Sequence, residues 1–305
     1  MTPLILAYGI STFTNSVFAK LCSNATRGTS KTTYALYLAL HSAIACIFYF
    51  LSSGASVRLN TVTLLYSLTF AVLILINMLV AMLKLRYASI LGAGILISPV
   101  SIMFTSLCGV IIFSETIAPV TYVRVALMTV SAVLIFFDIR IMAKKDGNTD
   151  AGKEKAKSNL KKFFPLAAIG VVLGAIQTII PKLFALSDSV TDEHSFYLMT
   201  NVFMLVAALS SFAFLTVKNK ENIKTSLVIF EPKRLAPTVL NVISNNVGSL
   251  VVIPILAVVD LAVYTPLTSA YGVVVSVVAS LCFREKLGVL SYLGAAVAIV
   301  AMVIQ

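Results

Sequence analysis

The sequence predicts an all-α membrane protein whose ten transmembrane helices form an inverted 5+5 repeat. Three observations predict this fold. Only 11% of the 305 residues are charged, and the mean hydropathy is +0.99, whereas soluble domains have about 25% charged residues. Apolar runs of about 20 residues, which can cross a bilayer core of about 30 Å as helices, recur along the whole chain. Similar segments also follow one another in the same order in the two halves of the sequence.

The apolar runs define ten expected helices. They cover residues 3–21, 34–53, 61–83, 89–113, 117–137, 163–184, 196–217, 236–258, 262–283 and 287–304. We expect helices because a segment in hydrocarbon must satisfy its own backbone hydrogen bonds, and these runs are too long and too apolar for barrel strands. The first run follows no positively charged segment, so we expect a retained helix and not a cleaved signal peptide.

One long polar stretch divides the chain. Residues 138–162 read DIRIMAKKDGNTDAGKEKAKSNLKK, which is highly charged and contains two glycines. We expect a flexible, basic linker here. It would separate a first five-helix repeat, residues 1–137, from a second five-helix repeat, residues 163–305.

The two halves resemble each other. A shift of 170 residues brings Glu115 onto Glu285, and TNSVFAKL (14–21) lies against IQTIIPKL (176–183) at a similar shift. Because five is an odd number, the second copy would cross the membrane in the opposite orientation. Inverted repeats of this kind build the midplane sites of many secondary transporters.

Short motifs at corresponding places in the two halves carry a resemblance to a known family. They are Asn15 and Lys20 in the first run, Pro99 before Ser114-Glu115, and Phe283-Arg284-Glu285-Lys286 before Tyr292-Leu293-Gly294. On these residues the chain resembles the drug/metabolite transporter (DMT) superfamily, specifically the ten-helix EamA-type permeases, over essentially its full length. The resemblance implies a multi-pass permease of the bacterial inner membrane that exports a small metabolite.

The net charge of +11 follows membrane topology and does not indicate nucleic-acid binding. The loops and helix ends after the first, third, fifth, seventh and ninth runs hold 20 of the 23 Lys and Arg residues. The positive-inside rule therefore predicts that both termini lie outside the cytoplasm. EamA-type permeases usually have both termini inside, so charge and resemblance disagree on this point.

Polar residues at helical spacing within the apolar runs are candidates for a substrate site, since each one destabilises a membrane helix unless it has a partner or water. The candidates from six runs are Asn15, Tyr37, His41, Asn77, Gln177, Tyr197, Asn201, Asn241 and Asn245. The repeat pairs Asn15 with Gln177 and places Asn77 near the counterpart of Asn245. The alternative is that these side chains only hydrogen-bond between helices.

The ninth run begins YTPLTSAYG, with Tyr264, Thr268 and Tyr271 around Pro266. A broken helix start of this kind often lines a transporter site. An ordinary helix N-terminus, with proline in its first turn and tyrosines at the membrane interface, explains the segment equally well.

Three basic residues are candidates for contact with an anion: Arg124, Lys20 and Lys182. Arg124 lies inside a run, where it would either snorkel to the interface or bind an anionic group. For Lys20 and Lys182, which lie near helix ends, snorkelling is the simpler interpretation. Glu115 and Glu285 each precede a run, where a carboxylate favours the N-terminal end of a helix.

Catalytic and metal-binding motifs are missing. The sequence has no GxSxG, HExxH or P-loop motif and only two histidines, so we expect neither enzymatic activity nor a cofactor. The four cysteines show no CxxC spacing and are expected to be buried free thiols, without a metal site or a disulfide. The expected partners are a small-molecule substrate and the lipid bilayer, with the chain as a monomer or homodimer.

The sequence therefore predicts a secondary transporter that moves a small metabolite by alternating access. None of the 12 acidic residues lies in the middle of a run, so a neutral, zwitterionic or mildly anionic solute such as an amino acid fits better than a cation. The alternative is a flippase for a lipid or lipid-linked precursor, with Lys20, Lys182 and Arg124 holding a phosphate. A non-transporting membrane scaffold would leave the repeat unexplained.

Overall fold

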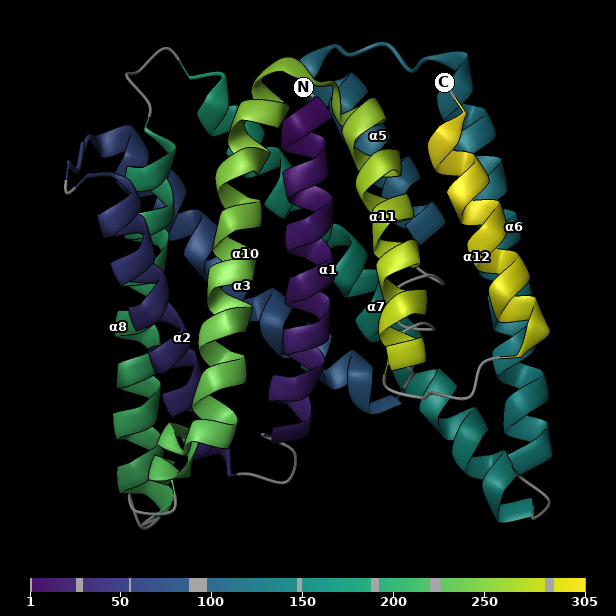
Figure 1. Ribbon diagram of the computed structural model, residues 1–305, viewed down its shortest axis with the longest axis horizontal. Coiled ribbons are helices and arrows are strands. Elements are labelled where there is room, and N and C mark those ends of the chain that lie inside the picture. Colours follow the sequence, from purple (N-terminus) through teal and green to yellow (C-terminus); the bar gives the residue numbers. More distant parts are fainter. Residues whose placement is uncertain are drawn as a thin grey trace. The chain divides into compact units, whose positions relative to one another are not determined.

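The chain is helical throughout the residues that the structure, a computed structural model, describes (Figure 1). These residues are 2–25, 30–54, 56–87, 98–146, 150–187, 192–219, 226–282 and 288–304. The helices are α1 (Thr2–Ala25), α2 (Lys31–Ser52), α3 (Thr61–Tyr87), α5 (Ser98–Phe113), α6 (Pro119–Asp146), α7 (Asp150–Ala185), α8 (Glu193–Asn219), the 3-10 helix η1 (Leu227–Phe230), α10 (Pro232–Val258), α11 (Leu261–Cys282) and α12 (Val289–Val303). Each expected range overlaps one of these α-helices, so the all-α prediction is confirmed for the described part.

Six of these helices contain a segment long and apolar enough to cross a membrane. The segments are Thr32–Ser52, Thr61–Val80, Pro119–Asp138, Lys162–Ala185, Glu193–Lys218 and Pro232–Val258. Shorter apolar segments occupy Val100–Phe113, Leu261–Val275 and Val289–Ala301. Helices of this length and composition fit an integral membrane protein.

Residues 138–162 do not form the expected flexible linker where the structure describes them. α6 continues to Asp146 and α7 begins at Asp150; residues 147–149 lie outside the described part. This stretch is rich in Lys and Ala, which favour helix whether or not they are buried. The prediction of a flexible linker, which relied on the charged composition of this stretch, is therefore wrong for its described residues.

The chain divides into two compact units that do not follow the two sequence halves. Unit 1 comprises Met1–Leu75 and Ile180–Ala257, and unit 2 comprises Ile76–Ile179 and Val258–Gln305. Each unit takes helices from both halves of the sequence. The expected repeats, residues 1–137 and 163–305, remain a prediction about sequence relationship.

In unit 1, α2 and α8 lie side by side (Figure 1). They run antiparallel, because Ser52 in the last turn of α2 hydrogen-bonds Nδ1 of His194 in the first turn of α8, at 3.0 Å. Aromatic rings fill the space between them: Tyr49 stacks on Tyr197 with 5.3 Å between the ring centroids. Such ring pairs add to the burial of apolar surface.

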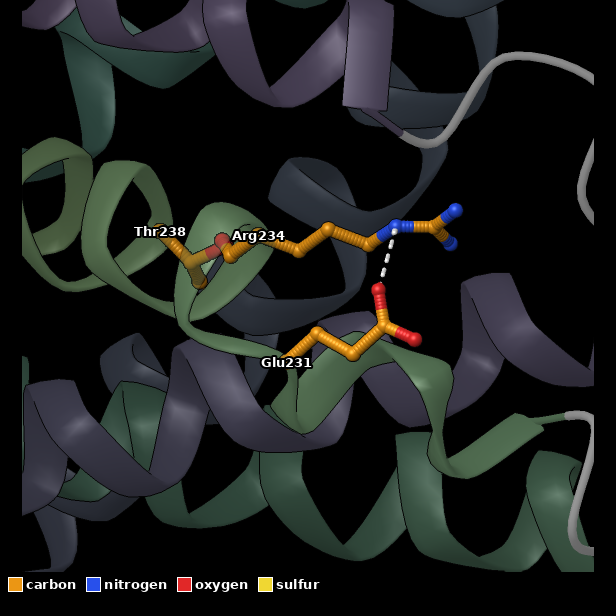
Figure 2. A network of polar contacts seen from close by, with 3 residues as sticks. All are labelled: Glu231, Arg234 and Thr238. Atoms are coloured by element: carbon orange, nitrogen blue, oxygen red, sulfur yellow. Dashed lines mark hydrogen bonds and ion pairs between the residues drawn. The ribbon is translucent and has the colours of Figure 1, made fainter.

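In unit 1, hydrogen bonds to Glu231 fix the point where α10 begins. The carbonyl of Glu231, which follows η1, accepts the backbone N–H groups of Arg234 and Leu235, both at 2.8 Å. Figure 2 shows the Arg234 side chain extended toward Glu231, with 3.9 Å between Nε and Oε2, while the Thr238 hydroxyl bonds the Arg234 carbonyl at 2.8 Å. Glu231 is exposed, so this ion pair contributes little to stability.

In unit 2, α6 and α12 lie side by side (Figure 1) and enclose a core with α5 and α11. Small residues permit this close approach, as is common between membrane helices. Gly294 of α12 shows it best, because an added Cβ would lie 2.7 Å from Ile135 Cγ1 and 2.9 Å from the Ser131 carbonyl oxygen of α6.

Glu115 stabilises a different helix from the one expected. Ser114 has a left-handed φ of 54°, which ends α5 and turns the chain. The Glu115 carboxylate then accepts a hydrogen bond from the backbone N–H of Leu261, the first residue of α11, at 2.9 Å. The carboxylate therefore caps α11, which is far from it in sequence; Glu285 lies outside the described residues.

Candidate functional site

A carboxamide contact joins α1 and α10 inside unit 1. Asn15 Nδ2 donates to Asn245 Oδ1 at 3.3 Å, and Asn241 Nδ2 donates to Asn15 Oδ1 at 2.7 Å. One turn away, the Ser11 hydroxyl donates to the Ser244 carbonyl. The structure thus brings together three of the sequence-predicted site residues.

A second carboxamide contact joins α3 and α7 inside unit 2. Asn77 Nδ2 donates to Gln177 Oε1 at 2.7 Å, and this bond is partly buried. Asn77 and Gln177 come from helices that are far apart in sequence. The expected repeat pairs Gln177 with Asn15 and places Asn77 near the counterpart of Asn245.

All four amides have the same place on their helices. Asn15, Gln177, Asn77 and Asn245 each follow an exposed apolar residue by five positions: Ile10, Val172, Val72 and Leu240. Five residues turn a helix by about 140°, so each amide lies away from the exposed apolar face. Asn15, Gln177 and Asn77 are half-buried there, whereas Asn245 is exposed.

Asn245 is exposed, although it does not lie on the apolar surface of α10. Leu240, Ile243 and Val247 form the exposed apolar face of this helix. Asn245 follows Ile243 by two residues, which places it on nearly the opposite side, beside the half-buried Ser249. This helix therefore presents a polar surface in addition to its apolar one.

The candidates on α2 and α8 are buried in unit 1. Tyr37 lies with its ring centroid 6.3 Å from that of His41, and Tyr197 stacks on Tyr49. The Asn201 amide donates to the Tyr197 carbonyl of its own helix at 2.8 Å, as the purely structural interpretation expects. Among these residues His41 differs, because its Nδ1 has no hydrogen-bond partner among the described residues.

The candidates on α11 hold the helix together around Pro266. Proline cannot donate to the carbonyl of Ala262, and this carbonyl instead accepts the Thr121 hydroxyl of α6 at 3.4 Å. The Thr268 hydroxyl bonds the Tyr264 and Thr265 carbonyls, both at 3.1 Å. Tyr264 is buried and Tyr271 half-buried. The carbonyl that Pro266 leaves without a backbone donor is therefore bonded, whereas the buried Thr265 hydroxyl has no partner among the described residues.

Arg124 does not snorkel to the interface. Its main role is also not to bind an anion, because its side chain is bonded within the protein. Its side chain is 9% exposed, and Nε and Nη2 both donate to the Ile304 carbonyl, at 3.2 and 2.8 Å. That carbonyl belongs to the residue that ends α12. A cation at a helix C-terminus is stabilising, so Arg124 acts as a cap.

The two lysine candidates have different outcomes. Lys182 is 5% exposed, which contradicts the expectation that it snorkels to the interface. Its position in the last turn of α7 complements the negative end of that helix. Lys20 belongs to α1, and its side chain lies outside the described part of the structure.

Sequence reasoning missed Asp138 and Asn246. Asp138, assigned to the linker, is buried and accepts the Gly288 N–H at 2.8 Å and the Ser291 hydroxyl at the start of α12. Asn246 is buried with Nδ2 unpartnered among the described residues. The only signal for Asn246 in the sequence was that it is adjacent to Asn245. A helix places adjacent residues about 100° apart, so the periodicity that singled out Asn245 did not include Asn246.

The described residues contain no group of three or more His, Cys, Asp or Glu side chains that could hold a metal ion. The four cysteines are free thiols. Three of them differ from the expectation of burial, since Cys46 and Cys108 are only partly buried and Cys282 is exposed. Only Cys22 is fully buried.

Comparison with known proteins supports the fold alone. No family model matches the chain, and no curated relative is found. A solved structure described as "Crystal structure of protein" is similar with a TM-score of 0.65 and 15% sequence identity, over 100% of this chain and 96% of that one. Similarity at this identity shows a shared fold along the full length.

Proposed function

We propose that the chain is a secondary transporter of the drug/metabolite superfamily, with ten membrane-spanning helices in an inverted repeat. It moves a small metabolite across the membrane by alternating access, in the direction of export. The direction of transport and the location in a bacterial inner membrane are what the resemblance of the sequence motifs implies.

The observation that carries this proposal is the reciprocity of the two amide contacts. The expected repeat pairs Asn15 with Gln177 and places Asn77 near the counterpart of Asn245. A twofold relation requires that, if one residue contacts a second, their counterparts contact each other. The bond from Asn15 to Asn245 and the bond from Asn77 to Gln177 satisfy this requirement.

The packing of whole helices supports the same relation. α2 packs on α8, α5 on α11 and α6 on α12, and the expected repeat makes each of these pairs a helix and its own counterpart. Self-pairs of this kind are what a twofold axis between two copies produces. Inverted repeats allow two equivalent conformations that open a site to either side.

The flippase alternative has less support. It relied on Arg124, Lys20 and Lys182 to hold a phosphate, and Arg124 is engaged by the end of α12. The amide contacts are uncharged, which fits a neutral or zwitterionic solute better than a phosphorylated headgroup.

The proposal is tested by solute exchange in proteoliposomes. The panel contains amino acids, nucleosides, sugars, organic anions and quaternary amines. We expect exchange of one neutral or zwitterionic class, and about a tenfold loss of rate in Asn15→Ala, equivalent to about 1.4 kcal/mol. Thr129→Ala is the matched control, because among the described residues this exposed hydroxyl bonds only the Val125 carbonyl of its own helix, at 2.8 Å.

Two results would contradict the proposal. One is the absence of exchange for every solute in the panel by protein that is folded in the membrane. The other is exchange only of lipids or phosphorylated headgroups, which would favour the flippase.

A further inference from the structure

His41 is a buried polar residue whose bonding is incomplete. Its side chain is 7% exposed, and Nδ1 has no partner among the described residues. Asn246 Nδ2 on α10 is in the same condition. Buried polar groups are almost always hydrogen-bonded, so an orphaned one indicates a further partner, such as a water molecule, an ion or a ligand.

The contacts within unit 1 place His41 at the level of the amide contact. Cys22 of α1 touches Thr238 of α10, at 3.8 Å between Sγ and Oγ1, and also interacts with Tyr37 of α2. Starting from this common point, His41 lies one helical turn along α2, and Asn241 lies about one turn along α10. The next turn of α10 brings Asn245.

The direction of each helix agrees with this register. Tyr49 of α2 lies near Ser249 of α10, so α2 and α10 run in the same direction from the end that carries Tyr37 and Thr238. α1 runs the opposite way, since Asn15 lies two turns before Cys22. His41, Asn15, Asn241 and Asn245 therefore form one layer across three helices, which we call the amide layer.

The chemistry of the amide layer indicates its ligand. A carboxamide presents an N–H donor beside a C=O acceptor, and a neutral imidazole presents one of each. Such groups pair with a ligand edge that also places a donor beside an acceptor. A carboxylate on the ligand offers acceptors only. It would pair with the N–H donors of the protein carboxamides and leave their C=O acceptors without a partner.

We propose that the amide layer binds the uncharged amide edge of the transported solute, with His41 and Asn245 in direct contact. The substrate class is a small carboxamide or lactam. This inference rests on the proposed transport function and specifies the substrate for it.

Two matched probe pairs test the proposal by thermal stabilisation of the purified protein. They are nicotinamide against nicotinate and glutamine against glutamate; in each pair the members have nearly the same shape and differ in an amide or a carboxylate. Ligand binding to the folded state raises the unfolding midpoint. We expect the amide of at least one pair to bind at least about tenfold more tightly than its carboxylate, because a site built for a hydrogen-bond donor rejects an analogue without it.

Three variants assign the contact. His41→Leu and Asn245→Leu should abolish the stabilisation by the amide, whereas His41→Gln, which keeps a donor and an acceptor, should retain it. Asn245 is exposed, so Asn245→Leu is expected to fold even if His41→Leu does not. Equal stabilisation by amide and carboxylate, no stabilisation by either amide, or unchanged stabilisation in both leucine variants would overturn the proposal.

Uptake of radiolabelled nicotinamide and glutamine into proteoliposomes separates this proposal from the proposed function. Uptake that is unaffected by His41→Leu and Asn245→Leu would leave the transporter intact and overturn the amide layer. Binding that depends on His41 without uptake or exchange of any solute would support the amide layer and contradict transport.

Discussion

Arg124 and Asp138 lie on the same helix, α6, and hold the two opposite ends of α12. Arg124 donates to the carbonyl of Ile304 at the C-terminal end of α12, and Asp138 accepts the N–H of Gly288 at its N-terminal end. The cation therefore meets the negative end of the helix dipole and the carboxylate meets the positive end. This arrangement fixes α12 antiparallel to α6 and explains two buried charges without reference to a substrate.

Asp138→Ala should destabilise the protein. The substitution removes a charged acceptor and leaves the buried Ser291 hydroxyl and the Gly288 N–H unpaired, which costs about 1.5–3 kcal/mol. Asp138→Asn, which keeps one carbonyl acceptor, should cost less. Unfolding in detergent measures the free energy, and Glu231→Ala is the control because that exposed pair is worth about 0–1 kcal/mol. Equal effects of the Asp138 and Glu231 substitutions would contradict the cap.

Arg124→Gln should loosen the end of α12 without a specific effect on transport. The expected loss is about 1–2 kcal/mol, since two hydrogen bonds to one carbonyl and a favourable dipole interaction are removed. Hydrogen exchange should increase at residues 300–304 and remain unchanged in α2. Loss of transport with unaltered stability and exchange would instead assign Arg124 to an anionic substrate.

Gly294→Ala should destabilise the protein more than the same substitution at a glycine that has no neighbouring atoms around the new Cβ. Its new Cβ would press on the Ser131 backbone, which cannot move as a side chain can, and overpacking of this kind costs about 1–3 kcal/mol. An added Cβ at Gly174 meets nothing within 4 Å, so Gly174→Ala should stabilise α7 by up to about 1 kcal/mol. Comparison of the two unfolding free energies checks the close approach of α6 and α12.

The Asn77 and Gln177 amides should be exchangeable as a pair. Asn77→Leu or Gln177→Leu alone leaves one amide without its partner, whereas the double substitution Asn77→Gln with Gln177→Asn keeps the contact. A double-mutant cycle built from the two leucine substitutions should give a coupling free energy between Asn77 and Gln177 of about 0.6 kcal/mol, and not more than about 1.7 kcal/mol. Thr69→Ala is the control on the same helix, because this hydroxyl is exposed and, in the part of the chain that the structure describes, bonds only the Leu65 carbonyl of α3. A coupling of zero would contradict the contact.

The charge distribution makes a prediction about membrane orientation. If both termini lie outside the cytoplasm, a cysteine in place of Val57, in the segment between α2 and α3, should react with an impermeant maleimide in intact cells. A cysteine in place of Val217, near the basic end of α8, should react only after permeabilisation; both positions are exposed. The native cysteines are first replaced. The reverse labelling pattern would support the usual orientation of EamA-type permeases.

The positions of the amides were predictable, but their partners were not. Helical periodicity and the repeat singled out Asn15, Asn77, Gln177 and Asn245, since both signals are local in sequence. Which amide meets which depends on how α1 docks on α10 and α3 on α7. That information is not contained in any single apolar run.

The sequence by itself determined the helical class, the approximate helix ranges and the faces that carry polar groups. Length, hydropathy and a period of 3.6 residues decide these properties locally. Only the tertiary structure decided the roles of Glu115, Arg124 and Asp138, each of which caps a helix more than 140 residues away. A charge in a membrane protein needs a partner wherever the fold can supply one, and that partner is chosen by helix packing.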